Sequence, residues 1–269
     1  MRVDVKHLLE SRVTTALRTL KGRSLFLATL CVTLLPTVTR AQFSVQPVIL
    51  GLATADSAAT GTVQLRNDGK EQIQFRFRLS DFDQTGTGDH YFQPLGTNAH
   101  SCKGRVDVYP DQATLLAGER QEIRVRMLPG QATCWGVLFV ERSARNTIGV
   151  MVAQQIAVKI YGIRPEIGVK GGITTVKASL DTSGVSVAFD FKNDGEGPVR
   201  PSGTIEIRTP AGDVVASESV DAFSVLPAHS RLVTVAIAHK LKPGRYVAVP
   251  VMDFGADYLA GGQATFAVP

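Results

Sequence analysis

Two short segments of this 269-residue chain occur twice, in the same order, and both carry the signals of β-strands. Leu65–Gly69 (Leu-Arg-Asn-Asp-Gly) returns as Phe191–Gly195 (Phe-Lys-Asn-Asp-Gly), and each copy ends a run of alternating apolar and polar residues. Further along, the loops Leu115–Arg120 and Val225–Arg231 each lead into a second alternating run. Alternation with period two and an Asn-Asp-Gly turn are typical of paired strands. The repeated plan therefore predicts two all-β domains of related design.

Residues 1–41 have the organisation of a secretory signal peptide. Several basic residues precede the uncharged apolar stretch Ser24–Val38, and small residues, Thr39 and Ala41, flank Arg40. This order predicts cleavage after Ala41 and an extracytoplasmic location, such as the periplasm. A transmembrane anchor is the weaker alternative, because the stretch is shorter than the roughly 20 residues that span a bilayer. We expect no membrane span in the mature chain, because it has no other apolar run of that kind.

Basic and acidic residues are balanced once this leader is removed. The whole chain has 29 Lys and Arg against 24 Asp and Glu; residues 1–41 hold seven of the former and two of the latter, which leaves 22 of each. The basic character of the full sequence is thus largely a property of the leader. Proteins that bind nucleic acid through overall charge need a basic surface. We therefore expect no nucleic-acid partner.

Two cysteines, Cys102 and Cys134, remain in the predicted mature chain, because Cys31 lies in the leader. An even pair in an exported chain predicts a disulfide, here within the first domain. Two buried thiols are the alternative. The sequence gives little support to a metal site at this place, because there is no Cys-x-x-Cys motif and only His100 lies near Cys102.

The strand signals and their spacing predict two immunoglobulin-like β-sandwiches. No segment after the leader shows a helical period longer than a turn or two. We assign residues 42–163 to the first domain, 164–168 to a linker and 169–269 to the second domain, each domain near the roughly 100 residues of one sandwich. Pro165 fixes the backbone inside the linker and favours a short, stiff elbow.

Three features of the first domain carry more specific expectations. Pro47 interrupts the opening strand, which suits an edge strand or one that changes sheets. Residues 81–103 are polar and rich in glycine, so we expect mostly loop there. Trp135 follows Cys134 in an apolar run, and we expect it in the core near the disulfide rather than on a surface that stacks on carbohydrate.

Scattered positions of residues 43–165 match the pattern of a known family. They are an opening strand, a strand that ends in asparagine, a Val-x-Val-x-Pro stretch, a Leu-Ala-Gly-x-x-Gln stretch and a long last strand that runs into Arg-Pro: Phe43–Leu50, Val63–Asn67, Val106–Pro110, Leu116–Gln121 and Val150–Pro165. In these positions the chain resembles the N-terminal domain of the periplasmic pilus-assembly chaperones (PapD-like). The second domain resembles the family only in being immunoglobulin-like.

The resemblance implies a mechanism for the long strand. Chaperones of this family lend that strand to an incomplete pilus subunit, so that backbone hydrogen bonds give affinity and alternating side chains fill pockets. By period two, Ile148, Val150, Val152 and Gln154 share one face, and the first three are the candidate donated side chains. The alternative is that this face packs into the core of its own domain.

The family also holds the terminal carboxylate of the subunit with two basic residues. Lys159 matches the residue on the long strand, although a lysine there also suits a solvated edge that resists aggregation. The resemblance places the second basic residue on the first strand, but Phe43–Leu52 contains no Arg or Lys. Arg164 is the remaining candidate for that role.

We find none of the common catalytic motifs, neither Gly-x-Ser-x-Gly, nor His-Glu-x-x-His, nor a Gly-rich phosphate loop. His90 and His100 lie near three aspartates, Asp81, Asp83 and Asp89, but without EF-hand spacing, so a solvated loop is the simpler interpretation. We expect no enzymatic activity, catalytic residue, metal or cofactor.

The sequence favours a non-enzymatic, chaperone-like protein that binds pilin-like subunits, with an outer-membrane usher as the further partner that the resemblance implies. A structural or adhesive two-domain surface module without a client is the alternative. A carbohydrate-binding accessory domain is a third hypothesis, which rests only on Trp135 and scattered tyrosines.

Overall fold

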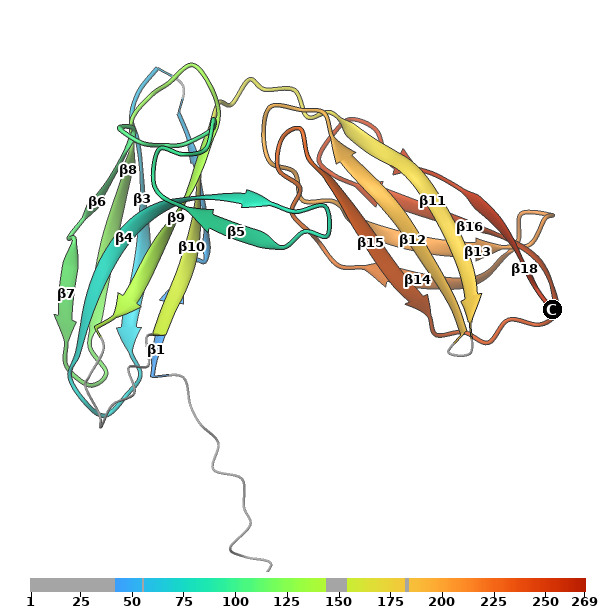
Figure 1. Ribbon diagram of the computed structural model, residues 1–269, viewed down its shortest axis with the longest axis horizontal. Coiled ribbons are helices and arrows are strands. Elements are labelled where there is room, and N and C mark those ends of the chain that lie inside the picture. The colour runs from blue at the N-terminus through green and yellow to red at the C-terminus, as the bar shows by residue number, and fades with distance from the viewer. Residues whose placement is uncertain (1–41, 55, 144–153, 182–183) are drawn as a thin grey trace, which may run out of the picture. The chain divides into compact units, whose positions relative to one another are not determined.

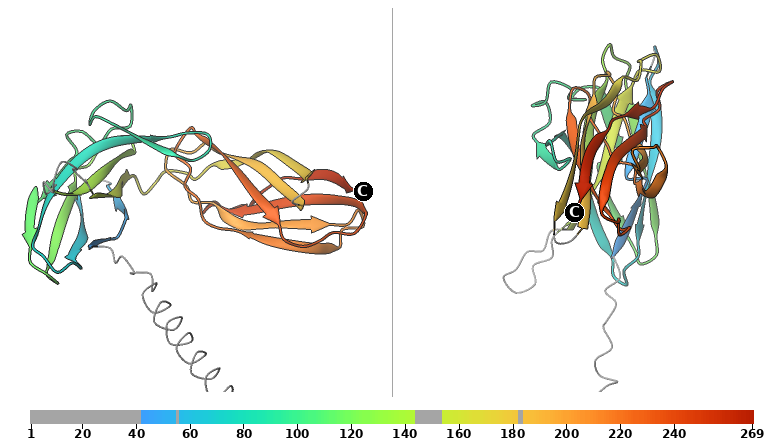
Figure 2. Two further views of the ribbon diagram at one scale, coloured as in Figure 1. Left: turned by 60° about the horizontal axis from the view of Figure 1, so that its bottom comes forward. Right: turned by 90° about the vertical axis from the view of Figure 1, so that its right-hand side faces the viewer.

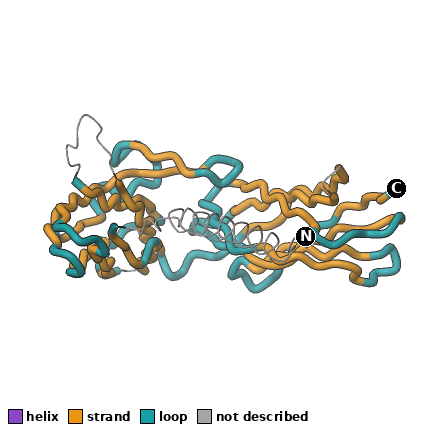
Figure 3. The backbone as a smooth tube through the Cα atoms, turned by 90° about the horizontal axis from the view of Figure 1, so that it is seen from below, coloured by secondary structure: helices purple, strands orange, loops and turns teal. Residues whose placement is uncertain are grey.

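The computed structural model describes residues 42–54, 56–143, 154–181 and 184–269, and this part of the chain consists of strands and loops (Figure 1, Figure 3). Within these ranges no helix is long and apolar enough to cross a membrane. The predicted leader, residues 1–41, lies outside the described residues. The strands form four sheets around two main cores. The predicted all-β fold is therefore confirmed.

The first sandwich is built from two sheets. One has the order β1 (Phe43–Gln46), β3 (Ala59–Asn67), β8 (Arg120–Met127), β6 (Val106–Tyr109). The other has the order β2 (Ile49–Ala53), β10 (Gln154–Ile163), β9 (Cys134–Arg142), β4 (Ile73–Gln84), β5 (His90–Gln93), and β7 (Gln112–Leu115) also pairs with β4. If strands β1, β3, β4, β6, β8, β9 and β10 are lettered A to G, the first sheet has the order A-B-E-D and the second contains G-F-C. This is the immunoglobulin arrangement.

Alternating side chains hold these two sheets together. In β8, Ile123 and Val125 are fully buried while Arg124 and Arg126 are exposed. Successive side chains of a strand point to opposite faces, so a period-two sequence yields one apolar face and one wet face. Burial of a large apolar side chain contributes roughly 1.5–3 kcal/mol. The alternation read from the sequence is thus the physical basis of this core.

The opening strand changes sheets at Pro47. Residues Phe43–Gln46 pair antiparallel with β3 in one sheet, and Ile49–Ala53 pair parallel with β10 in the other. Proline has no N–H to offer a ladder, which suits it to the crossing point. Of the two predicted alternatives, an edge strand or a strand that switches between sheets, the second is confirmed.

The second sandwich has the same plan with fewer strands. One sheet is β11 (Gly171–Asp181), β12 (Gly184–Asn193), β15 (Ser230–Ile237), and the other is β14 (Val214–Val220), β13 (Ser202–Arg208), β16 (Gly244–Asp253), with β17 (Ala260–Gly261) and β18 (Ala264–Val268) also paired to β16. Phe189, Phe191 and Ile205 are buried between them. The chain thus has two immunoglobulin-like sandwiches, as predicted, while the domain limits at residues 163 and 169 stay predictions.

The repeated Asn-Asp-Gly segments make the same contact in both sandwiches. Asn67 and Asn193 are fully buried at the ends of β3 and β12. The side-chain amide of Asn67 donates to the carbonyl oxygens of Glu71 (2.7 Å), Leu115 (3.0 Å) and Leu116 (3.0 Å). That of Asn193 donates to those of Gly197 and Val225, both at 2.9 Å. Each asparagine therefore ties its strand end to the loop that the second repeated segment forms.

The two loops also share a backbone conformation. The N–H of Gly118 donates to the carbonyl of Asn67, and the N–H of Ala228 donates to that of Asn193. Both residues are left-handed, with φ of 78° at Gly118 and 62° at Ala228. Glycine adopts this conformation without the steric cost that a Cβ brings. The second copy thus keeps the geometry of the first at a position where alanine has replaced glycine.

Most of residues 81–103 lie in turns and loops, as expected, but the segment also contains a hairpin that the sequence did not predict. Strand β4 continues to Gln84 and forms a hairpin with β5, His90–Gln93 (Figure 2). Asp81 is fully buried in the strand, and its Oδ2 accepts hydrogen bonds from three backbone amides, those of Gly96, Thr97 and Asn98. A buried carboxylate is tolerated when it is hydrogen-bonded in this way. Polar composition therefore did not exclude strands from this segment.

The predicted disulfide between Cys102 and Cys134 is confirmed. It joins residues 32 apart in the sequence, and closing a loop of this length stabilises by about 4 kcal/mol in the chain-entropy description. Trp135, the next residue, is fully buried, as expected. Its ring stacks on that of His100, with centroids 4.2 Å apart, and its Nε1 donates to the carbonyl of Phe82 at 3.1 Å.

Candidate functional site

One edge of strand β10 is only partly paired. Strand β9 accompanies β10 from Gln154 to Gly162, but β2 accompanies its other edge only from Lys159 to Ile163. The N–H of Lys159 donates to the carbonyl of Val48 on that side. Successive residues of a strand direct their backbone groups to opposite neighbours, so the groups of Ala157 and Gln155 face this edge as well. No described strand pairs with them, which leaves an edge that can accept another strand.

Most of the predicted donor face falls on residues that the structure does not describe. Ile148, Val150 and Val152 are among residues 144–153, which lie outside the described residues. Gln154 is exposed, and its Oε1 accepts a hydrogen bond from Arg142 at 3.3 Å. Further along the same face, Ile156 and Val158 pack into the core of the first sandwich. Donation of the side chains at 148–152 stays a prediction.

Lys159 lies on the opposite face of β10, in partly buried surroundings. Its Nζ is 3.0 Å from Nε2 of His90 and 5.8 Å from the centre of the Phe82 ring. Burial lowers the pKa of Lys159, and the positive charges of Arg231 and Arg200 lower it further. No acidic group within the described residues forms an ion pair with Lys159. An ammonium in such surroundings favours an incoming anion.

The two arginines come from the second sandwich. Arg231 lies in β15; its guanidinium carbon is 5.3 Å from the centre of the Phe223 ring, and its Nη1 donates to the carbonyl of Ser224 at 3.4 Å. Arg200 precedes β13 and lines an open groove with the Val45–Ile49 segment. Burial raises the pKa of Tyr161 to about 12, although the charge of Arg200 opposes this shift.

The β4–β5 hairpin holds this part of the second sandwich against the first. Gln84 donates to the carbonyl of Ser224 at 2.8 Å and accepts from the N–H of Leu226 at 3.1 Å. An oxygen of Asp83 lies 2.8 Å from Nε2 of His229. Leu226 is fully buried in an apolar cluster that also contains Trp135. These contacts place the loop before β15, and with it Arg231, beside β10.

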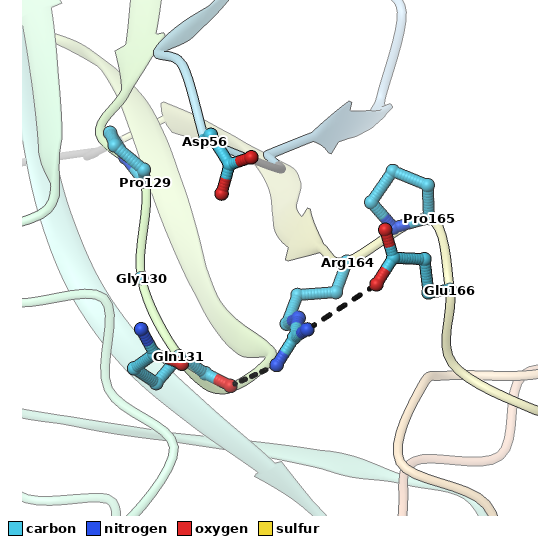
Figure 4. A pocket seen from close by; sticks show the side chains of 7 residues that line it. All are labelled: Asp56, Pro129, Gly130, Gln131, Arg164, Pro165 and Glu166. Carbon is cyan, nitrogen blue, oxygen red and sulfur yellow. Dashed lines mark hydrogen bonds and ion pairs between the residues drawn. The ribbon is translucent and has the colours of Figure 1, made fainter.

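Arg164, the predicted second anchor, has other neighbours. It follows β10, and its Nη1 donates to the carbonyl of Gln131 at 3.1 Å while Nη2 lies 3.6 Å from an oxygen of Glu166 (Figure 4). Asp56 and Pro165 line the same small pocket. Within the described part of the chain, Arg164 makes its polar contacts at this pocket and Lys159 makes its own with His90. The structure does not bring the two candidate anchors into contact.

The two histidines of residues 81–103, His90 and His100, contact different residues. His90 contacts Lys159, whereas His100 stacks on Trp135. The carboxylate of Asp81 accepts hydrogen bonds from backbone amides, and that of Asp83 contacts the ring of His229. The described residues contain no group of three or more side chains that could hold a metal ion. Asp83, Gln84 and His90 are contact residues that the sequence did not identify, since a segment interpreted as loop gives no signal for a hairpin that binds a distant loop.

His90 carries a pH-dependent prediction. Burial lowers its pKa below the ordinary 6.5, Lys159 and Arg231 lower it further, and Asp89 opposes them. Because the folded pKa lies below the unfolded one, the free energy of unfolding falls as pH drops from 6.5 through the folded pKa. We expect NMR titration of the ring to show a pKa below 6.5, and Lys159→Met to raise it. Lys170→Met is the matched control, and an equal effect of both changes would contradict this assignment.

Comparison with known proteins gives no match among family models or curated proteins. Among solved structures, the chain is similar to fimbrial chaperones along most of its length. It matches the class 5 fimbriae chaperone CfaA with 14% identity and a TM-score of 0.49, over 84% of this chain and 99% of that one. It matches a chain of the CsuC–CsuE chaperone–tip adhesion subunit complex from Acinetobacter baumannii with 16% identity and a TM-score of 0.45, over 83% and 98%. It matches the Escherichia coli chaperone DraB with 14% identity and a TM-score of 0.42, over 84% of this chain and 97% of that one.

Proposed function

We propose that this chain is an exported, non-enzymatic chaperone that binds extracytoplasmic, β-rich, pilin-like subunits by pairing its β10 strand with them. The observation that carries the proposal is the open edge of β10 at Gln155 and Ala157, next to Lys159. An extended segment that joins a sheet edge gains backbone hydrogen bonds whatever its sequence, and alternating side chains add specificity. A client whose own sheet lacks a strand would be completed by this edge.

The proposed site residues have different roles. The sequence assigns the donated apolar side chains to Ile148, Val150 and Val152, with Gln154 at the boundary to the paired part of β10. Lys159 would bind the terminal carboxylate of the client, which supplies the negative charge that its described surroundings lack. The sequence suggests Arg164 as a second anchor, but its polar contacts are with Gln131 and Glu166 at another pocket. An outer-membrane usher is the proposed recipient of the loaded chaperone, and the periplasm is the proposed compartment.

An affinity pull-down of the tagged mature protein tests the proposal. The native extracytoplasmic fraction is applied, and retained proteins are identified by mass spectrometry. We expect a small, β-rich secreted protein that the wild type retains, and whose recovery falls at least tenfold with Lys159→Ala and below detection with Val150→Asp and Val152→Asp combined. The loss follows because charged groups at donated positions must be desolvated in the pockets of the client.

Lys170→Ala is the matched control, an exposed lysine outside β10 whose change should leave recovery unaltered. Circular dichroism checks that each variant is folded. Equal recovery of the partner by the wild type and all variants would contradict strand donation. Absence of any retained partner would favour the alternative, a structural or adhesive surface module without a client.

A further inference from the structure

We infer that the second cation of the carboxylate site comes from the second sandwich, from Arg231 with support from Arg200, and that Arg164 lies outside the site. The inference rests on the proposed function, because it specifies how the site that contains Lys159 recognises its ligand. The ligand chemistry is a carboxylate, and the source we assign is the free C-terminus of a polypeptide that has paired with the β10 edge. Carboxylate binding would then require both sandwiches.

The cations that share the surroundings of Lys159 come from the second sandwich. The first strand has no Arg or Lys from Phe43 to Leu52. Arg164 is engaged with Gln131 and Glu166. Arg231 and Arg200, by contrast, act electrostatically on Lys159, and Arg231 acts on His90 as well. The positive charge beside Lys159 is therefore supplied from β15 and from the segment before β13.

Arg231 is held in a fixed position, and not all of its N–H donors have a hydrogen-bond partner among the described residues. Its guanidinium lies over the Phe223 ring, and the backbone of Gly88 packs so closely that a Cβ there would overlap it. Its Nε is buried without a hydrogen-bond partner among the described residues. A buried donor left unpaired carries a desolvation cost. An arginine that is positioned by an aromatic ring and still has unused donors is suited to a carboxylate.

Two acidic groups of the hairpin near the site have partners other than these cations. Asp83 is bound by His229, and Asp89 accepts a hydrogen bond from Thr87 in the turn of the hairpin. Neither forms an ion pair with Lys159, Arg200 or Arg231, and these three cations have no ion pair with any described residue. Like charges that gather in partly desolvated surroundings raise each other's free energy. A bound carboxylate removes that cost, which is why this cluster predicts an anionic ligand.

The hairpin makes the cluster conditional on contact between the sandwiches. Gln84 and Asp83 bind the segment from Ser224 to His229, which leads into Arg231. The N–H of Leu232, the next residue, donates to the carbonyl of Gly86 at 2.8 Å. The hairpin also contributes His90, which contacts Lys159. The same element therefore positions both a cation of the second sandwich and the direct neighbour of the lysine.

A pair of synthetic peptides tests the inference on the full mature protein. The probe is an acetylated, fluorescein-labelled nonapeptide of alternating valine and serine with a free C-terminal carboxylate, and its control is the same peptide with a C-terminal amide. Fluorescence anisotropy gives both dissociation constants. We expect the wild type to bind the acid at least tenfold more tightly than the amide. Arg231→Gln should remove most of that preference, Arg200→Gln a smaller part, and Arg164→Gln none.

The outcomes separate this inference from the proposed function. Arg231→Lys, which keeps the charge, should retain part of the preference, and thermal unfolding checks each variant. If the preference survives Arg231→Gln and Arg200→Gln but disappears in Arg164→Gln, the inference is wrong while the carboxylate site stands. If the wild type does not distinguish acid from amide, or binds neither, the carboxylate site itself is wrong. Competition by inorganic phosphate as effective as that by the peptide acid would overturn the assignment to a polypeptide terminus.

Discussion

Replacing Asn67 by alanine is expected to lower the free energy of unfolding by about 4 kcal/mol. The side-chain amide of Asn67 donates to three carbonyl oxygens, and its own oxygen accepts from the N–H of Gly69 at 3.0 Å. Alanine offers none of these bonds, and the carbonyls remain where water has little access. A buried polar group without a partner costs about 1–3 kcal/mol. Chemical denaturation followed by circular dichroism measures the change.

The second copy and an adjacent residue supply matched comparisons. Asn193→Ala removes two such donations instead of three, so we expect a loss of about 3 kcal/mol. Asp68→Ala alters the same turn but removes only a partly exposed ion pair with Arg66, which costs at most about 1 kcal/mol. If Asn67→Ala were no more destabilising than Asp68→Ala, the buried asparagine would not hold the loop, and the repeat would reflect turn geometry alone.

The repeat shows how far the sequence could lead. Alternation and the Asn-Asp-Gly turns predicted the strands on either side, and the downstream repeats predicted loops that enter further strands. The structure shows that the two repeated segments are halves of one contact, because the carbonyls that bind Asn67 and Asn193 include those of Leu115 and Val225. These partners are 48 and 32 residues away. Local patterns report strand period and turns, but not which distant carbonyl a side chain reaches.

The hairpin was missed for the same physical reason. Its polar residues are satisfied by a part of the chain about 140 residues away, where Gln84 binds Ser224 and Leu226. Tertiary contacts of this kind override local propensity. The candidate site, likewise, could be predicted only in part. Lys159 could be proposed from its place on the long strand, whereas its cationic neighbours Arg231 and Arg200 could not, because sequence separation hides their proximity.

Replacing Ala157 by proline is expected to abolish client capture while the first sandwich remains folded. Ala157 directs its backbone groups to the open edge of β10, so the change removes an N–H that a client strand would use and puts a ring in its path. The bonds between β10 and β9 are made by the alternate residues, and Ile156↔Val140 and Val158↔Leu138 are partners in that register. Proline also favours an extended conformation at the residue before it, which a strand already has.

The measurement is the recovery of the client in the pull-down, with thermal unfolding of each variant alongside. We expect recovery to fall at least a hundredfold with Ala157→Pro, because the client loses the central backbone hydrogen bond of the added strand. Ala157→Ser is the matched control, since it keeps the N–H and nearly the same volume, and it should bind as the wild type does. Full capture by a folded Ala157→Pro protein would show that clients do not pair with this edge. Strand addition would then be wrong, even if Lys159 still binds a carboxylate.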